Sequence, residues 1–155
     1  HGRPVTEIQM ADLLREVRRR FDFCLLDAPA GLGRGFQLAT CAADRCVVVT
    51  TADASSLRDA QHTVMELDRF PSGALHLVVN RVRKKLLRQL HATIDDAIDK
   101  AGLPLLGVVP EDDALPLCMN RGVPILLADG QSAATAYRNI AKRLQGERVP
   151  LLRIR

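Results

Sequence analysis

Short apolar runs alternate along this sequence with stretches that repeat at helical spacing, and this alternation leaves few folds open to the chain. Four runs have the length and composition of buried strands: residues 23–26, 46–50, 75–79 and 105–109. Strands that alternate with helices form βαβ units, in which a mostly parallel sheet has helices on both faces. The sequence therefore predicts an α/β fold.

Helices are predicted from apolar residues three and four positions apart and from capping residues. Thr6 followed by Gln9 is a capping-box pattern, so a helix is expected over residues 6–20. Ser55 or Ser56 is expected to cap the helix after the second strand. Further helices are expected over residues 36–43, 87–98, 113–120 and 133–144, with an extended segment over 123–127.

Composition indicates a single domain and narrows the classes of function. A chain of 155 residues can bury a substantial core, and no linker or repeat divides it. Aromatic residues make up only 3%, with no Trp, which argues against recognition of single-stranded nucleic acid by stacking. The net charge of +4 is modest. We expect no specific nucleic-acid partner.

The cysteines are spaced like structural thiols rather than like metal ligands or disulfide partners. Cys24, Cys41, Cys46 and Cys118 lack C-x-x-C spacing and lie mostly in apolar surroundings. Reduced, buried thiols and an intracellular setting are expected. The sequence shows no signal peptide, and its apolar runs are far shorter than the ~20 residues of a membrane-spanning helix.

Small polar residues follow the apolar runs. Asp27, Thr50–Thr51, Asn80 and Pro110–Asp112 end the four predicted strands. The carboxyl ends of parallel strands meet at one rim, where open α/β sheets bind their ligands. The Asn80 carboxamide offers the donor and acceptor that suit the edge of adenine, although an ordinary turn also uses Asn. Arg81 could lie over the base.

The first of these strand ends has a second interpretation. An apolar run that ends on an acid is the form of the Mg²⁺-side motif of P-loop NTPases, and Asp27 fits it; the alternative is an Asp that caps the next turn. Gly31 permits a positive φ, so its N–H can face an anion. Residues 31–35 are glycine-rich but lack the Lys-Ser/Thr of a phosphate loop, so we expect a switch loop there, with a flexible stretch over residues 33–35.

Five segments together resemble the MinD/ParA family of P-loop ATPases, on its MinD side. They occur in the family's order and with similar spacing, and the resemblance runs from about residue 21 to 152, nearly the whole chain. The segments are Phe21–Gly31, Ala43–Thr51, Ser55–Asp59, Val78–Val82 and Gly107–Asp112.

The resemblance implies that the chain works with ATP and Mg²⁺. Asp27 would orient the water shell of Mg²⁺, and the Gly31 amide would approach the γ-phosphate. Asn80 would read adenine, with Arg81 beside it. The walls of the base pocket would come from Pro110, Glu111 and Asp112.

The resemblance also implies partners. Ser55, Ser56, Arg58 and Asp59 match a helix start that contributes to the surface for an inhibitor of the MinC type, although an ordinary capped helix explains them as well. Proteins of the family act as homodimers in the cytoplasm, and some attach to the inner membrane. This chain's tail, residues 149–155, contains a Pro and is too short for the amphipathic helix that such attachment uses.

The sequence departs from the family in one essential part, because it contains no G-x-x-x-x-G-K-[ST] phosphate loop or Lys-rich equivalent. We therefore expect residues 1–155 to be the carboxyl-terminal portion of a single MinD-like domain that lacks the phosphate-loop strand. Its partner would be the missing amino-terminal half or a complementing chain. By itself the segment should not hydrolyse ATP.

Several functions remain open at this point. The first is a P-loop ATPase switch in the selection of the cell-division site. A ParA-type partitioning ATPase and a non-catalytic nucleotide- or partner-binding relative are alternatives. An iron–sulfur ATPase relative would need a cluster ligand such as Cys41 or Cys118.

Overall fold

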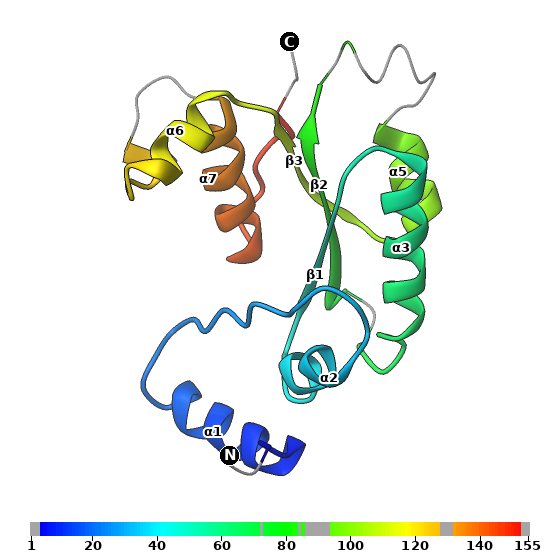
Figure 1. The fold of residues 1–155 in the computed structure, drawn as a ribbon, viewed down its shortest axis with the longest axis vertical. Coiled ribbons are helices and arrows are strands. Elements are labelled where there is room, and N and C mark those ends of the chain that lie inside the picture. The colour runs from blue at the N-terminus through cyan, green and yellow to red at the C-terminus, as the bar shows by residue number, and fades with distance from the viewer. Residues whose placement is uncertain (1–3, 72, 84, 86–93, 128–131, 153–155) are drawn as a thin grey trace. The chain divides into compact units, whose positions relative to one another are not determined.

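A computed structural model describes residues 4–71, 73–83, 85, 94–127 and 132–152. The chain divides into two compact units, His1–Cys46 and Val47–Arg155. The first unit holds helices α1 and α2, and the second holds nearly all of the sheet and the helices that cover it (Figure 1). Within the described residues, no helix is both long enough and apolar enough to cross a membrane.

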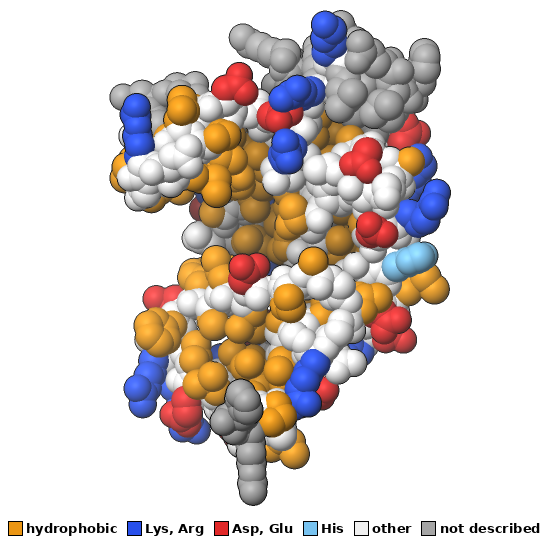
Figure 2. Space-filling view, viewed as in Figure 1, with side chains coloured by type: hydrophobic (Ala, Val, Ile, Leu, Met, Phe, Trp, Pro, Cys, Tyr) orange, Lys and Arg blue, Asp and Glu red, His pale blue; other side chains and the backbone are white. Residues whose placement is uncertain are grey.

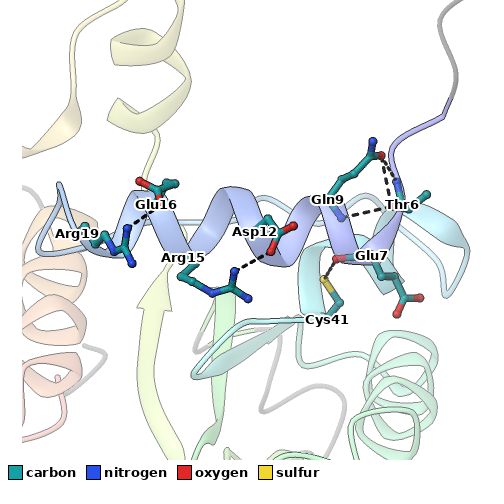
Figure 3. Close-up of polar contacts among 8 residues, drawn as sticks. All are labelled: Thr6, Glu7, Gln9, Asp12, Arg15, Glu16, Arg19 and Cys41. Atoms are coloured by element: carbon teal, nitrogen blue, oxygen red, sulfur yellow. Dashed lines mark hydrogen bonds and ion pairs between the residues drawn. The ribbon is translucent and has the colours of Figure 1, made fainter.

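Helix α1 (Glu7–Arg18) begins with the capping box that the sequence predicts. Thr6 Oγ1 accepts a hydrogen bond from the Gln9 N–H at 3.2 Å, and Gln9 Oε1 accepts one from the Thr6 N–H at 3.0 Å (Figure 3). Both bonds satisfy amides that a helix start otherwise leaves unpaired. Ion pairs three positions apart add local support along the exposed side: Asp12 with Arg15 and Glu16 with Arg19 (Figure 3).

Helix α2 (Arg34–Thr40) starts earlier than the sequence predicts, with Gly33 as its N-cap. Residues 33–35 therefore begin a helix instead of forming a flexible loop. A Cβ at position 35 would collide with the ring of Pro29, so this position accepts only glycine without rearrangement. Arg34 donates to the Val5 carbonyl at 2.6 Å, which fastens the start of α2 to the residue before the α1 cap.

The strand predicted over residues 23–26 is absent. These residues belong to no strand, and Phe23 and Leu25 are 69% and 90% exposed. A strand needs a neighbour to pair its backbone groups, and no described strand pairs with this segment. The family resemblance places the phosphate-loop strand beside this segment, and this sequence has no phosphate loop. The prediction of a buried strand over residues 23–26 is therefore wrong for this 155-residue chain.

The sheet contains β1 (Cys46–Thr50), β2 (Leu75–Val82) and β3 (Leu105–Pro110) in the order β1-β2-β3. Strands β2 and β3 run parallel, with Leu77 opposite Leu105 and Val82 opposite Pro110. Strand β1 is buried on one face only, because Val48 and Thr50 are buried whereas Val47 and Val49 are 37% and 60% exposed. The predicted α/β class is thus confirmed, with β1 at the edge of the sheet.

Helices lie on both sides of the sheet, as predicted (Figure 1). Helix α7 (Ser132–Leu144) packs on β3 so closely that a Cβ at Gly107 would collide with Ile140. The opposite side holds α3 (Ala54–Met65) and α5 (Ile94–Ala101), which contact each other. The core cluster between α7 and the sheet includes residues of α7 itself. It consists of Val78, Leu106, Val109, Ile125, Ala133, Ala134 and Ala136.

The end of α7 ties the following segment to the sheet through one arginine. Arg143 donates to the carbonyls of Leu106 at 2.7 Å, Val149 at 2.8 and 3.0 Å, and Pro150 at 2.6 Å. Burial lowers the pKa of this guanidinium from its ordinary value. Residues 149–152 are not helical, as the sequence predicts.

Other element boundaries differ from the predictions in informative ways. Asp53, not Ser55 or Ser56, caps α3, and its carboxylate accepts from the Ser56 N–H at 3.0 Å. Residues 123–127, predicted to be extended, contain a 3₁₀ turn, η1 (Ile125–Leu127), that follows Pro124 and buries Ile125 in the core. Helix α6 (Ala114–Asn120) lies as predicted. Leu87 and Leu90, part of the stripe before α5, lie outside the described residues.

None of the four cysteines forms a disulfide, and none is buried. Cys24 is exposed because it lies in the unpaired segment, and Cys41, Cys46 and Cys118 are half-buried. The prediction of buried thiols is therefore wrong. Cys41 Sγ lies 3.2 Å from the Leu38 carbonyl, an ordinary contact for a helical thiol.

Candidate functional site

The carboxyl ends of β2 and β3 lie side by side in the second unit. Val82 pairs with Pro110, and the Glu111 N–H donates to the Val82 carbonyl at 3.1 Å. The structure thereby brings Asn80 and Arg81 next to the Pro110–Asp112 corner. These residues come from segments 30 positions apart, and strand pairing alone places them at one rim.

The sequence predicts that this strand ends at Asn80. In the structure, β2 continues past Asn80 to Val82 through a bulge. The register shifts between Val79 and Val82, and Arg81 has a φ of 53°. The half-buried Asn80 turns its Oδ1 back to accept from the Arg81 N–H at 2.9 Å. Because the donor is a backbone N–H, the acceptor must be the amide oxygen, which fixes the orientation of the carboxamide. Its NH₂ group has no hydrogen bond to a described residue.

Glu111 pairs with two arginines, Arg81 near the end of β2 and Arg83 just after it. Its Oε1 lies 3.3 Å from Arg81 Nη2, and its Oε2 pairs with Arg83 Nε. The carboxylate side chain is only 21% exposed, whereas the two arginines are 68% and 60% exposed. Hydrogen bonding from Arg83, and to a smaller extent from Arg81, lowers the pKa of Glu111 despite the opposing effect of burial. Glu111 therefore stays ionised between two cations.

The Asp112 carboxylate accepts hydrogen bonds from backbone amides at the starts of two helices. Its Oδ1 accepts from the Ala114 N–H of α6 at 3.1 Å. Its Oδ2 accepts from the Ala133 N–H of α7 at 3.2 Å and faces the Ser132 hydroxyl at 3.4 Å. A carboxylate at the start of a helix pairs free amides and faces the positive end of the helix dipole. Both carboxylate oxygens are thus occupied within the protein.

The end of β1 supplies a further capped helix start. The Ser56 N–H and then the Thr51 hydroxyl hold the pKa of Asp53 at about 2, below its ordinary 3.8. Asp53 was not among the predicted capping residues, although an acid three positions before the Ser56 amide is a capping pattern that indicates it. Ser55, Arg58 and Asp59 are exposed on the first turns of α3, and Ser56 is half-buried.

Asp27 and Gly31 lie in the first unit. Asp27 is exposed and has no hydrogen bond or ion pair to a described residue. Gly31 has a φ of 85°, so it adopts the left-handed conformation that the sequence analysis allowed for it. Among the residues that the structure describes, no group of three or more His, Cys, Asp or Glu side chains gathers as a metal cage would require.

A family model described as "Cellulose biosynthesis protein BcsQ" matches residues 5–144. The chain is also similar to the septum site-determining protein MinD of Bacillus subtilis, with 37% identity over 145 residues. That alignment covers 92% of this chain and 54% of the relative. MinD of Synechocystis is 33% identical over 147 residues, which cover 93% of this chain and 55% of the relative. The chain thus spans about half the length of these curated relatives.

Solved structures give the same result. The MinD cell division protein of Aquifex aeolicus superposes with a TM-score of 0.89 at 30% identity, covering 96% of this chain and 64% of that one. A MinC:MinD complex from Aquifex aeolicus matches with a TM-score of 0.89 at 29% identity, covering 97% and 63%. MinD of Pyrococcus horikoshii complexed with Mg-ADP shares the fold, with a TM-score of 0.76 at 24% identity, covering 90% and 56%. The chain belongs to the MinD/ParA family of ATPases.

Proposed function

We propose that this chain is the carboxyl-terminal part of a MinD-like ATPase that acts in the selection of the cell-division site. The observation that carries the proposal is the meeting of Asn80 and Arg81 with Pro110 at the ends of parallel strands, the position where α/β sheets hold ligands. Curated relatives from Synechocystis and Bacillus subtilis are septum site-determining proteins, which supports the cellular role.

The residues present fit adenine nucleotide. The Asn80 NH₂ has no described partner, and its Oδ1 keeps a second lone pair, so the carboxamide can pair with the edge of adenine. The aliphatic ring of Pro110 and the plane of Arg81 are available beside it. Glu111 and Asp112, in contrast, have both carboxylate oxygens engaged within the protein, so we assign them to the wall of the pocket through their backbone only.

We assign the contacts with Mg²⁺ and phosphate to Asp27 and Gly31. Asp27 has an exposed carboxylate without a described partner, which suits a residue that holds Mg²⁺ through water. Gly31, with its positive φ, can offer its N–H to a phosphate. Mg²⁺ bound with ATP would neutralise charge on the phosphates.

Turnover of ATP requires a part that this sequence does not contain, because no phosphate loop occurs in it. Hydrophobic side chains lie at the surface (Figure 2). Exposed apolar residues occur in both units, and they are consistent with surfaces that a further polypeptide covers. These residues are Phe23, Leu25, Val47 and Val49. We assign this cover to the amino-terminal half of the domain or to a complementing chain. Without it, the 155 residues should be inactive.

The remaining assignments follow the relatives. We propose a cytoplasmic homodimer that contacts a MinC-like protein through Ser55, Ser56, Arg58 and Asp59, because three of these side chains are exposed at the start of α3. A MinD relative is known in complex with MinC. Contact with the inner membrane would belong to the full-length protein.

A second candidate process comes from the family model, whose description names cellulose biosynthesis rather than cell division. The two processes separate in a deletion strain. Loss of the division function would produce minicells or filaments, and loss of the other would lower cellulose output, measured by dye binding. A ParA-type role in partitioning would show as plasmid or chromosome loss in the same strain.

The nucleotide site is tested by titrating MgATP into the complete protein by calorimetry. Asn80→Ala should weaken binding by about 1–3 kcal/mol, or roughly 5- to 150-fold, because polar groups of the base lose their partner. Asn120→Ala, the same substitution at the exposed end of α6, should leave affinity unchanged. Equal affinities for the wild type and Asn80→Ala would refute the assignment. Tight binding without turnover by the complete wild-type protein would favour the non-catalytic alternative.

A further inference from the structure

Arg81 is the one residue other than glycine with a positive φ among those the structure describes. A residue with a Cβ disfavours this conformation, which persists only where the surroundings enforce it. The contacts around Arg81 therefore identify the residue that enforces this conformation.

Three successive residues at the end of the bulge contact one residue, Glu111, which directly follows the neighbouring strand β3. The Glu111 carboxylate pairs with Arg81 through Oε1 and with Arg83 through Oε2. The Glu111 N–H donates to the carbonyl of Val82, which lies between them, at 3.1 Å. Glu111 thus holds residues 81 and 83 through its side chain and residue 82 through its backbone N–H.

The same bulge sets the direction of Asn80. Asn80 Oδ1 accepts from the Arg81 N–H, so the orientation of the Asn80 carboxamide depends on the orientation of the peptide group between Asn80 and Arg81. If the bulge relaxed, coupled rotations of ψ at Asn80 and φ at Arg81 would turn the peptide plane between them, move this N–H and release the carboxamide. The orientation of Asn80 therefore depends on the conformation that Glu111 restrains.

We propose that Glu111 is a positioning residue: its side chain orients the Asn80 carboxamide for a purine base by clamping the Arg81 bulge and does not itself touch the nucleotide. The inference rests on the proposed function, in which Asn80 reads the base. Two features separate this role from a direct one. Both Glu111 oxygens are occupied by arginines, and the arginines neutralise a charge that would otherwise repel an anionic ligand.

The ion pairs of Glu111 with Arg81 and Arg83 restrain the bulge locally and contribute little to the free energy of unfolding. Both arginines are more than half exposed, and exposed ion pairs add little to global stability. A substitution at Glu111 should therefore leave the protein folded while loosening the bulge, which makes the role testable.

The test uses Glu111→Gln in the complete protein, with Glu147→Gln as the matched control. Glu147 is exposed just after α7 and has no ion pair to a described residue. Hydrogen exchange read by mass spectrometry should speed up at least threefold in peptides covering residues 80–83 of Glu111→Gln. Peptides from β3 and α7, and the control variant, should keep their rates. Unchanged exchange over residues 80–83 would overturn the proposal.

The second readout is affinity for MgADP. Glu111→Gln should weaken binding about fivefold, as expected for the loss of one modest charged contact. In the Asn80→Ala background the same substitution should have less than a twofold effect, because the residue it positions is gone. Full additivity of the two substitutions would show that Glu111 affects nucleotide binding independently of Asn80 and would overturn the proposal. A wild type that does not bind MgADP would refute the proposed function, while the exchange measurement would still decide whether Glu111 clamps the bulge.

Discussion

The double cap at Asp112 gives the sharpest prediction about stability. Asp112→Ala removes the acceptors for the Ala114 and Ala133 amides and for the Ser132 hydroxyl. Loss of one N-cap costs about 1 kcal/mol, with a range of roughly 0.5–2. Because this carboxylate serves two helices, we expect a loss of roughly 1–3 kcal/mol in the free energy of unfolding. Asp112→Asn keeps one oxygen and should lose about half as much.

The measurement is urea denaturation followed by circular dichroism at pH 7. With a slope of about 2 kcal/mol per molar urea, the midpoint of Asp112→Ala should fall by roughly 0.5–1.5 M. The neighbouring acid supplies a matched control, since Asp113 is the N-cap residue of α6 but makes no side-chain capping bond. Asp113→Ala should change stability by less than about 0.5 kcal/mol. Equal effects of the two alanine substitutions would refute the capping role.

Three further predictions concern the second unit. Gly107→Ala should destabilise the fold by about 1–3 kcal/mol in the same urea assay, because the added methyl meets Ile140; an unchanged midpoint would contradict this. Arg143→Met should cost roughly 2–3 kcal/mol, because it removes a charged donor from three backbone carbonyls. A loss below about 0.5 kcal/mol would contradict this. Asp53 has a pKa of about 2 in the folded state, below its ordinary 3.8, so its contribution is complete above pH 4 and lost as pH falls toward 2. The stability difference between wild type and Asp53→Ala, about 1 kcal/mol at pH 7 after allowance for exposure, should shrink over that range, and a constant difference would contradict the cause assigned.

The elements predicted well from the sequence are those defined by local patterns. The Thr6 and Gln9 capping box forms as expected, and β1 has the predicted bounds. Strand 23–26 fails although its pattern is as strong as that of β1, because a strand also needs a partner and the pattern carries no information about one. Local sequence therefore predicts which segments can be strands, and pairing decides which of them are.

The candidate site shows the same division between local and long-range information. The sequence predicts that Asn80 and Pro110 share a rim, because parallel strands end together. It does not show the bulge at Arg81, which depends on a glutamate 30 positions away. Nor does it show that Asp112 faces Ser132 and the start of α7, since their approach depends on how the helix packs on β3.

The most direct test of the account is photolabelling of the complete protein with 8-azido-ATP and Mg²⁺, followed by mass spectrometric mapping of the labelled peptides. The azide lies on the base, so it marks the residues that surround adenine. The account predicts label on peptides containing residues 78–83 and 109–113, and loss of that label when ATP is added in excess. Label that ATP displaces but that lies elsewhere in the protein would contradict the claim that the ends of β2 and β3 hold the nucleotide base.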